Sequence, residues 1–305
     1  MLKNATILKN NYIVKVHDGD RMNTKWLLPH FPVVNQLKET TKVRIVFDGS
    51  ASYKNCSLND AIHQGPNLQQ DLLKVLMRFR INMIAIVCDI EEMFLQVEMK
   101  PEDRTYFRFL WRDNPRESPE IYEFQRVIFG GRASPFLAQF VARFNASRFQ
   151  NEFPRAVETI EKSTYMDDSL YSVGLEEEAV ELCNHLTHVW GEAGMVARKW
   201  LSNSAEVMEV IPLDKRAGNV EIKDSSSLPT SKTLGIVWDA NTDMLRLKIN
   251  IPKSVCGTKR EFLRVVSSVF DPLGLVSPML ILAKVMMQEL WIKKVEWDEK
   301  LERKG

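Results

Sequence analysis

The chain has 305 residues, of which 45% are hydrophobic and 27% are charged, and its formal net charge is +1. This is the composition of an ordinary globular protein with enough apolar material for a substantial core. The near-neutral charge excludes an overall electrostatic attraction to nucleic acid but allows a local basic channel. No run of about 18 apolar residues occurs, so we expect no membrane span. The four cysteines form no CxxC pair, which predicts reduced thiols in an intracellular compartment.

The sequence pattern of the N-terminal half predicts short strands separated by helices. Paired prolines require extended backbone, alternation of basic and apolar residues indicates a strand, and leucines at helical spacing indicate a helix. The expected elements, in chain order, are a polar N-terminal arm (1–25), extended chain (26–34), a strand (42–48), a helix (68–79), a buried strand (83–88) that stops at Asp89, and a pair of strands (105–111 and 121–128).

The C-terminal half predicts a further strand pair and then mainly helices. Ser134 and Pro135 indicate a helix start, with Ser134 as the N-cap. The expected elements that follow are two strands (163–166 and 169–173), a helix (179–193) that stops at Gly194, a strand (234–238), and helices after the capping box at Thr258 and over 279–291. We therefore expect a mixed α+β body to about residue 245 and a helical tail to residue 305.

Two adjacent carboxylates, Asp167 and Asp168, lie between the two short strands at 163–173. A two-residue connection between strands is hairpin geometry, and Asp tolerates the backbone angles of a turn. Both carboxylates would then lie at an exposed tip, where like charges repel unless a cation lies between them. A hard divalent cation with oxygen ligands is one interpretation. A solvated turn is the other.

Asp89, at the end of the buried strand, is the second acidic signal. An Asp at a strand end is often a cap for the next turn. A third carboxylate converging on the Asp167–Asp168 hairpin would, however, complete the ligand set for two Mg²⁺ ions about 3.5–4 Å apart, as in polymerases. At such a site the protein contributes to phosphoryl transfer mainly by positioning the reactants and neutralising charge.

Several further stretches occur in a characteristic order. They are residues 28–33, 41–51, 57–60, 65–66, 89–94, 129–131, 134–137, 165–168, 198–200, 234–235 and 270–275. None is decisive alone, but their order and spacing together are specific. The chain resembles a reverse transcriptase, in particular the pol segment of Bel/Pao-type LTR retrotransposons, from about residue 26 to residue 297.

The resemblance implies an α+β, right-hand polymerase fold, with fingers and palm around an antiparallel sheet and a helical thumb-like C-terminal part. We accordingly expect an N-terminal arm at 1–25, fingers and palm at 26–245, and a thumb or connection segment at 246–305. The resemblance also implies that Asp89, Asp167 and Asp168 are the catalytic carboxylates. They would bind two Mg²⁺ ions, with Mn²⁺ as a possible substitute.

Further side chains are implied for the incoming deoxynucleotide. Arg44, with Lys38 beside it, would grip the triphosphate, because a guanidinium fork binds phosphate in two places. Phe94 has the position of an aromatic steric gate against the ribose 2′-hydroxyl, and Gly130 would let the backbone approach the nucleotide. Lys199 falls where polymerases place a cationic proton donor to pyrophosphate. Taken singly, a solvated strand face, a core position and surface charge are the alternatives for Arg44, Phe94 and Lys199.

The resemblance also implies contacts with template and primer. Leu234 and Gly235 resemble the primer grip, which holds the growing strand against the palm. Basic residues of the thumb would contact phosphates. The residues expected to bind nucleic acid are Tyr165, Met166, Leu234, Gly235, Lys259 and Arg260.

These expectations describe an RNA-directed DNA polymerase of a retrotransposon, which extends a primer on an RNA or DNA template from dNTPs by two-metal nucleotidyl transfer. The alternative is a catalytically silent or domesticated nucleic-acid-binding fragment of the polyprotein. A peptidase is disfavoured, because neither Asp-Thr-Gly nor Asp-Ser-Gly occurs. We expect an intracellular location, in a cytoplasmic virus-like particle or the nucleus. The protease, RNase H and integrase of the pol polyprotein are expected partners that are not recognisable in this chain.

Overall fold

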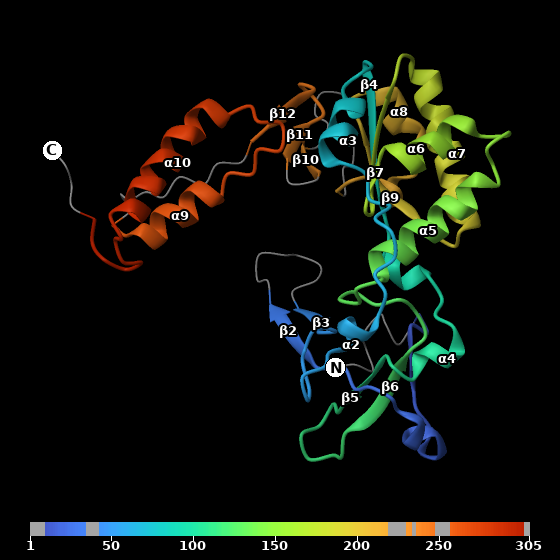
Figure 1. The fold of residues 1–305 in the computed structure, drawn as a ribbon. Coiled ribbons are helices and arrows are strands. Elements are labelled where there is room, and N and C mark those ends of the chain that lie inside the picture. Colours follow the sequence, from blue (N-terminus) through green and yellow to red (C-terminus); the bar gives the residue numbers. More distant parts are fainter. Residues whose placement is uncertain (1–9, 35–42, 219–229, 234–235, 248–256, 302–305) are drawn as a thin grey trace. The chain divides into compact units, whose positions relative to one another are not determined.

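The computed structural model describes residues 10–34, 43–218, 230–233, 236–247 and 257–301 (Figure 1). The chain divides into two compact units, each built from separate stretches. Unit 1 consists of Met1–Gln70, Ile90–Asp167 and Asn184–Ala197, and unit 2 consists of Asp71–Asp89, Asp168–Cys183 and Arg198–Gly305. This division differs from the expected arm, body and tail, because both units draw on the middle of the chain.

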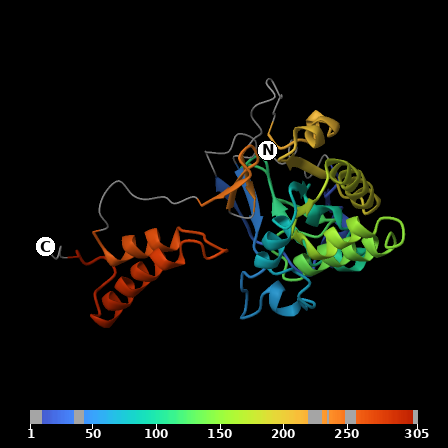
Figure 2. The same ribbon diagram turned by 90° about the horizontal axis from the view of Figure 1, so that it is seen from above.

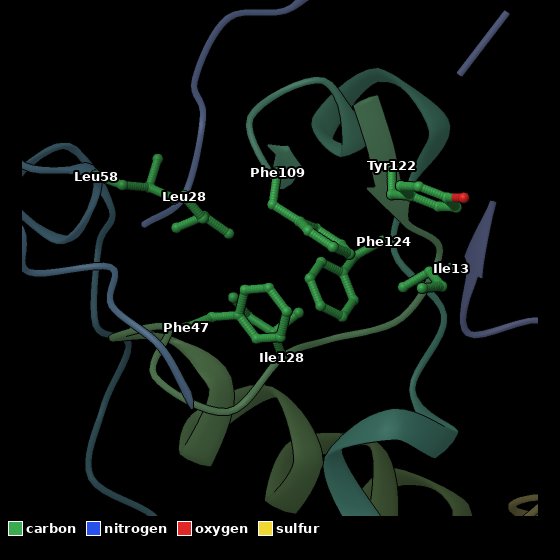
Figure 3. Close-up of a cluster of buried hydrophobic side chains, with 8 residues drawn as sticks. All are labelled: Ile13, Leu28, Phe47, Leu58, Phe109, Tyr122, Phe124 and Ile128. Atoms are coloured by element: carbon green, nitrogen blue, oxygen red, sulfur yellow. The ribbon is translucent and has the colours of Figure 1, made fainter. Parts of the chain in front are cut away.

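Unit 1 contains an antiparallel sheet in the order β1-β6-β5 and a separate antiparallel pair, β2 and β3. The strands are β1 (Ile13–Lys15), β2 (His30–Val34), β3 (Val43–Phe47), β5 (Arg108–Trp111) and β6 (Glu120–Phe124). Buried apolar side chains from these strands and the neighbouring loops form one cluster (Figure 3). Its members are Ile13, Leu28, Phe47, Leu58, Phe109, Tyr122, Phe124 and Ile128. Burial of each large side chain contributes about 1.5–3 kcal/mol, so this cluster is a principal source of stability for unit 1.

The segment expected to be a separate N-terminal arm is part of unit 1 where the structure describes it. β1 pairs with β6, and Ile13 is 1% exposed. The buried Arg108 side chain holds the 3-10 helix Asp18–Asn23, because its guanidinium pairs with both Asp20 and Glu123. A strand of three residues is too short to show alternation, which is why the sequence pattern did not reveal it.

Of the helices of unit 1, the sequence patterns predicted only the one that starts at Ser134. These helices are α2 (Leu58–Ala61), the 3-10 helix η3 (Met93–Gln96), α4 (Pro101–Arg104), α5 (Ser134–Ser147) and α6 (Pro154–Lys162), which the short strand β7 (Thr164–Tyr165) follows. α5 begins at Ser134 with a proline in its first turn, as predicted. The predicted N-cap is wrong, however: Ala133 holds that position, and Ser134 is the first helical residue.

Unit 2 contains a sheet in which β4 (Ile84–Ile90) lies between β8 (Asp168–Val173) and β9 (Ala197–Ser202). β4 and β8 are antiparallel. The predicted apolar run forms the buried part of β4, but the strand continues through Asp89. α3 (Leu72–Phe79) packs on β8 and buries three apolar side chains.

The rest of unit 2 is a small sheet and several helices. The sheet has the order β10-β11-β12, from β10 (Thr230–Thr233), β11 (Ile236–Asp239) and β12 (Met244–Arg246). The helices are α8 (Ala205–Val210), the 3-10 helix η4 (Leu213–Lys215), α9 (Lys259–Ser267) and α10 (Ser277–Ile292). α9 and α10 pack alongside each other in both views (Figure 2), and the Thr258 side chain caps α9 as predicted.

α7 (Glu176–Glu192) contributes residues to both units. Gly194 follows it with a φ of 69°, the left-handed backbone that the predicted helix stop requires. Within the described part of the chain, the helices lack the combined length and hydropathy that a membrane span needs.

Candidate active site

The segment Tyr165-Met166-Asp167-Asp168 forms a two-residue turn, one residue earlier than predicted. β7 ends at Tyr165 and β8 begins at Asp168, so Met166 and Asp167 make the connection. Met166 has a φ of 57°, a left-handed backbone that is uncommon for side chains other than Gly, Asn and Asp. The sequence interpretation placed both Asp residues at the tip because Asp favours turns. Asp168 is instead the first residue of a strand.

Asp89 and Asp168 are Cα partners on the neighbouring antiparallel strands β4 and β8. Residues directly opposite in such a pair project to the same face, with Cβ atoms about 4.5–5.5 Å apart. Two of the three predicted carboxylates are therefore adjacent. The Asp89 side chain is 19% exposed. The sequence predicted that Asp89 and Asp168 lie close together, and the pairing of β4 with β8 is what brings them together.

Asp167, the third predicted carboxylate, is tied to the end of β4 through its backbone. Its carbonyl oxygen accepts a hydrogen bond of 2.8 Å from the backbone N–H of Ile90, the residue after Asp89. This bond fixes the turn that precedes Asp168. Asp167 and Asp168 are consecutive, so the position of one limits the position of the other.

Two cations from β9 occupy both oxygens of the Asp89 carboxylate. Arg198 Nε donates to Oδ1 at 3.1 Å, and Lys199 Nζ donates to Oδ2 at 3.0 Å. Neighbouring residues of a regular strand point to opposite faces. Lys199 has a φ of 52°, and this left-handed backbone interrupts the alternation, so that both side chains reach one carboxylate. The sequence predicted Lys199 at the nucleotide and did not single out Arg198 as a site residue.

The pair Asp89 and Asp168 has the chemistry that suits Mg²⁺, since hard cations prefer carboxylate oxygens. Cys88 is unsuited as a ligand, because burial raises the pKa of its thiol well above the usual value. Among the described residues, no group of three or more His, Cys, Asp or Glu side chains is arranged to hold a metal ion. A divalent ion fits the carboxylate pair in chemistry and register.

Phe94, the predicted steric gate, lies in η3 and is half-buried. Its ring packs against that of Phe129, with 4.8 Å between centroids. Gly130, the next residue, has a φ of 99°, and a Cβ built there would lie 2.3 Å from the carbonyl oxygen of Phe47. Glycine is therefore required here by the protein's own backbone. Its predicted contact with nucleotide stays a prediction.

Asn59 joins the loop after β3 to the turn before α5, and the sequence analysis did not assign it a role in the site. Its Nδ2 donates to the Gly130 carbonyl at 3.1 Å and to Ser50 Oγ at 2.9 Å, while its Oδ1 accepts from Arg132 N–H at 2.8 Å. The available signal was its place in the motif at 57–60. There, only the role of Ser57 as the cap of α2 is evident from local rules.

The other residues predicted to bind the nucleotide or the primer lie in different segments of the chain. The backbone of Arg44 lies in β3, opposite Val33. Met166 Sδ accepts from Gln139 Nε2 at 3.7 Å. Lys38, Leu234 and Gly235 lie outside the described residues.

The structure does not present Lys259 to a nucleic-acid phosphate. This residue is 3% exposed, its Nζ donates to the Val295 carbonyl at 2.9 Å, and it lies 3.8 Å from the centroid of the Trp291 ring. Arg260 is exposed, but its guanidinium forms a two-point ion pair with Asp298, at 2.8 and 2.9 Å. Both side chains therefore hold the segments around α9 and α10 together, a role that charge alone could not reveal.

The sequence was compared with models of known protein families. Residues 33–199 match the family model for reverse transcriptase (RNA-dependent DNA polymerase), which covers more than half of the chain, and the chain belongs to this family. Residues 258–305 match the model for a Pao retrotransposon-like RNaseH-like domain. The two matches together confirm the Bel/Pao-type reverse transcriptase segment that the sequence motifs predicted.

Two solved structures from foamy virus share the fold. The first, a foamy viral protease-reverse transcriptase (dRH) in complex with double-stranded DNA, has 15% identity and a TM-score of 0.61, over 97% of this chain and 43% of that chain. The second, a foamy viral protease-reverse transcriptase in complex with an RNA/DNA hybrid, has 14% identity and a TM-score of 0.61, over 97% and 33%. These matches confirm the polymerase fold. The chain spans less than half the length of either relative, and no curated protein matched it.

The family match at the C-terminal end adds a description that the sequence analysis lacked. The expectation that this chain contains no RNase H segment is wrong, and the expectation for 246–305 is a thumb or connection segment. Residues 258–305 of that segment match the RNaseH-like model, and where described they form α9 and α10. The assignment of the segment to a thumb stays a prediction.

Proposed function

We propose that the chain is the polymerase segment of a retrotransposon reverse transcriptase and that it extends a primer from dNTPs. The observation that carries the proposal is the register of β4 and β8, which sets Asp89 opposite Asp168 in a chain of this family. Asp167, whose backbone carbonyl accepts a hydrogen bond from Ile90, would supply the third carboxylate.

The three carboxylates would hold two Mg²⁺ ions, or Mn²⁺ in their place. When bound, such ions lower the pKa of an attacking hydroxyl and neutralise developing phosphate charge. Asp89 and Asp168 provide oxygens from two paired strands, so the sheet fixes the spacing between them. Rigid placement of this kind is the main contribution that a protein makes to phosphoryl transfer.

In the proposed reaction the primer 3′-hydroxyl loses its proton to solvent and its oxygen forms a bond to the α-phosphorus of the dNTP, while the bond from that phosphorus to the pyrophosphate oxygen breaks. Arg44 and Lys38 bind the triphosphate. Phe94 excludes the ribose 2′-hydroxyl, and the backbone at Gly130 approaches the nucleotide. Lys199, once it leaves Asp89, donates a proton to the departing pyrophosphate.

Template and primer are the proposed macromolecular ligands. The foamy viral relatives were solved with a DNA duplex and with an RNA/DNA hybrid, and we extend this property to the present chain. Tyr165, Met166, Leu234 and Gly235 would contact the primer end. The protease and integrase of the polyprotein are the proposed partners, since residues 258–305 themselves match the RNaseH-like model. A cytoplasmic virus-like particle or the nucleus is the proposed location.

The test is Mg²⁺-dependent primer extension on an RNA template with the purified chain. Asp168→Asn removes one ligand charge and is expected to reduce the rate by about 10³-fold, since metal stabilisation of the transition state is worth several kcal/mol. Asp103→Asn, at an exposed position in α4, is the matched control and should retain activity. Equal rates for wild type and Asp168→Asn would contradict the proposal. An inactive wild type that still binds template would favour the silent-fragment alternative.

A further inference from the structure

We propose that Arg198 and Lys199 are counter-ions that hold Asp89 in the metal-free protein, and that a divalent ion binds by displacing them. In this role they are positioning residues: they set the orientation of a metal ligand and the affinity of the site. The inference rests on the proposed function, because it assigns Asp89 to the metal site.

The contacts supply the first argument. Both oxygens of the Asp89 carboxylate accept from a cation, Oδ1 from Arg198 at 3.1 Å and Oδ2 from Lys199 at 3.0 Å. Asp168 lies opposite Asp89 on β8, the strand that flanks β4 on the side away from β9. Two positive charges thus balance the two adjacent carboxylates, so that like-charge repulsion is relieved without a metal ion.

The backbone of β9 supplies the second argument. Lys199 has a φ of 52° within a strand, a strained conformation for a residue with a side chain, which persists only where its surroundings impose it. The left-handed residue brings Lys199 to the same carboxylate as its neighbour Arg198. A regular strand would send one of the two side chains to the opposite face.

Exposure shows why the contacts can be exchanged. The Lys199 side chain is 55% exposed and that of Arg198 is 35% exposed. Ion pairs whose cation is open to solvent are weak, so the exchange of these contacts for a divalent ion costs little. Lys199 is then released toward solvent, where a polyphosphate can reach it. Metal binding and the presentation of this cation would therefore be linked.

The test is a titration of the purified chain with Mn²⁺ in the absence of nucleotide, followed by electron paramagnetic resonance of the free ion. Lys199→Met and Arg198→Met each remove one repelling charge and are expected to tighten Mn²⁺ binding by about three- to tenfold. Lys199→Arg keeps the charge and should restore affinity near that of wild type. Lys74→Met, on the exposed surface of α3 in the same unit, removes a charge elsewhere and should change nothing.

The outcomes separate this inference from the proposed function. Tighter binding in both charge-removing variants, but not in Lys74→Met, supports the counter-ion role. Unchanged or weaker binding in those variants, with a clear loss in Asp168→Asn, overturns it and leaves the proposed metal site standing. Binding that is the same in every variant, Asp168→Asn included, overturns both. If Arg198→Met fails to fold, Lys199→Met decides alone: tighter binding than in Lys199→Arg supports the role, and equal or weaker binding overturns it.

Discussion

Single side chains determine the chemistry of the candidate site. Asp89 has an acidic neighbour in β8 and two basic neighbours in β9, so its carboxylate lies at the boundary between opposite charges. The acidic side of this boundary could be predicted from the sequence, because Asp residues at strand ends and in turns follow recognisable patterns. The basic side could not, because it depends on a long-range strand pairing and on left-handed backbone at Lys199.

Phe94→Ala tests the steric gate at the residue scale. The phenyl ring is half-buried and packs on Phe129, so its removal opens space beside η3. If the ring excludes the 2′-hydroxyl, the ratio of ribonucleotide to deoxynucleotide incorporation should rise by about tenfold or more. Single-nucleotide primer extension with matched dNTP and rNTP measures this ratio. Phe144→Ala, at an exposed position of α5, is the control. A ratio equal to that of wild type would assign Phe94 to packing alone.

Among the elements, the tight turn at Gly130 is fixed by backbone contacts. Gly130→Ala places a methyl group 2.3 Å from the Phe47 carbonyl oxygen at a φ of 99°. We expect a loss of about 2–3 kcal/mol in the free energy of unfolding, because the strain cannot be relieved by a side-chain movement. Gly191→Ala in α7 meets nothing within 4 Å and should stabilise by up to about 1 kcal/mol. Urea denaturation of both variants measures the difference. Similar values for the two would refute the constraint.

The small sheet of unit 2 is held to α3 by an ion pair that responds to pH. Burial raises the pKa of the Asp243 carboxyl, but hydrogen bonds from Arg80 and Trp238 outweigh this effect and hold the pKa below its usual value. A carboxyl with a depressed folded pKa stabilises the fold above its unfolded pKa, and the contribution disappears as pH falls through the folded value.

Asp243→Asn should therefore cost about 1 kcal/mol at pH 7, a figure reduced for solvent screening, and progressively less as pH falls below about 4. Urea denaturation at several pH values measures this. Asp103→Asn on α4 is the control for the change of charge. A cost that does not depend on pH would mean that Asp243 acts through packing and not through its charge.

Element types were easier to predict than their exact edges or pairings. The apolar run before Asp89 identified β4, and helical spacing identified α5 and α7. The turn was misplaced by one residue, because Met166 takes the left-handed position that local rules assign to Asp. Lys259 appeared to be a surface cation, but it lies beside Trp291, which is 32 residues away along the chain (291 minus 259). Such contacts leave no periodic signal.

At the scale of the whole molecule, the order of the sequence motifs was what predicted the family. Family matches over residues 33–199 and 258–305 agree with it, and two foamy viral structures share the fold at about 15% identity. At that distance the fold is retained while most side chains differ. The roles of Arg44, Phe94 and Lys199 therefore have to be tested in this chain.

The most direct measurement is the rate of single-dNTP incorporation into a primer on an RNA template, with Mg²⁺, by wild type and by Asp89→Asn. Asp89 is common to the metal site and to the counter-ion contacts. We expect Mg²⁺-dependent incorporation by wild type and a loss of about 10³-fold in Asp89→Asn. Incorporation by the variant at the wild-type rate would contradict the assignment of the active site.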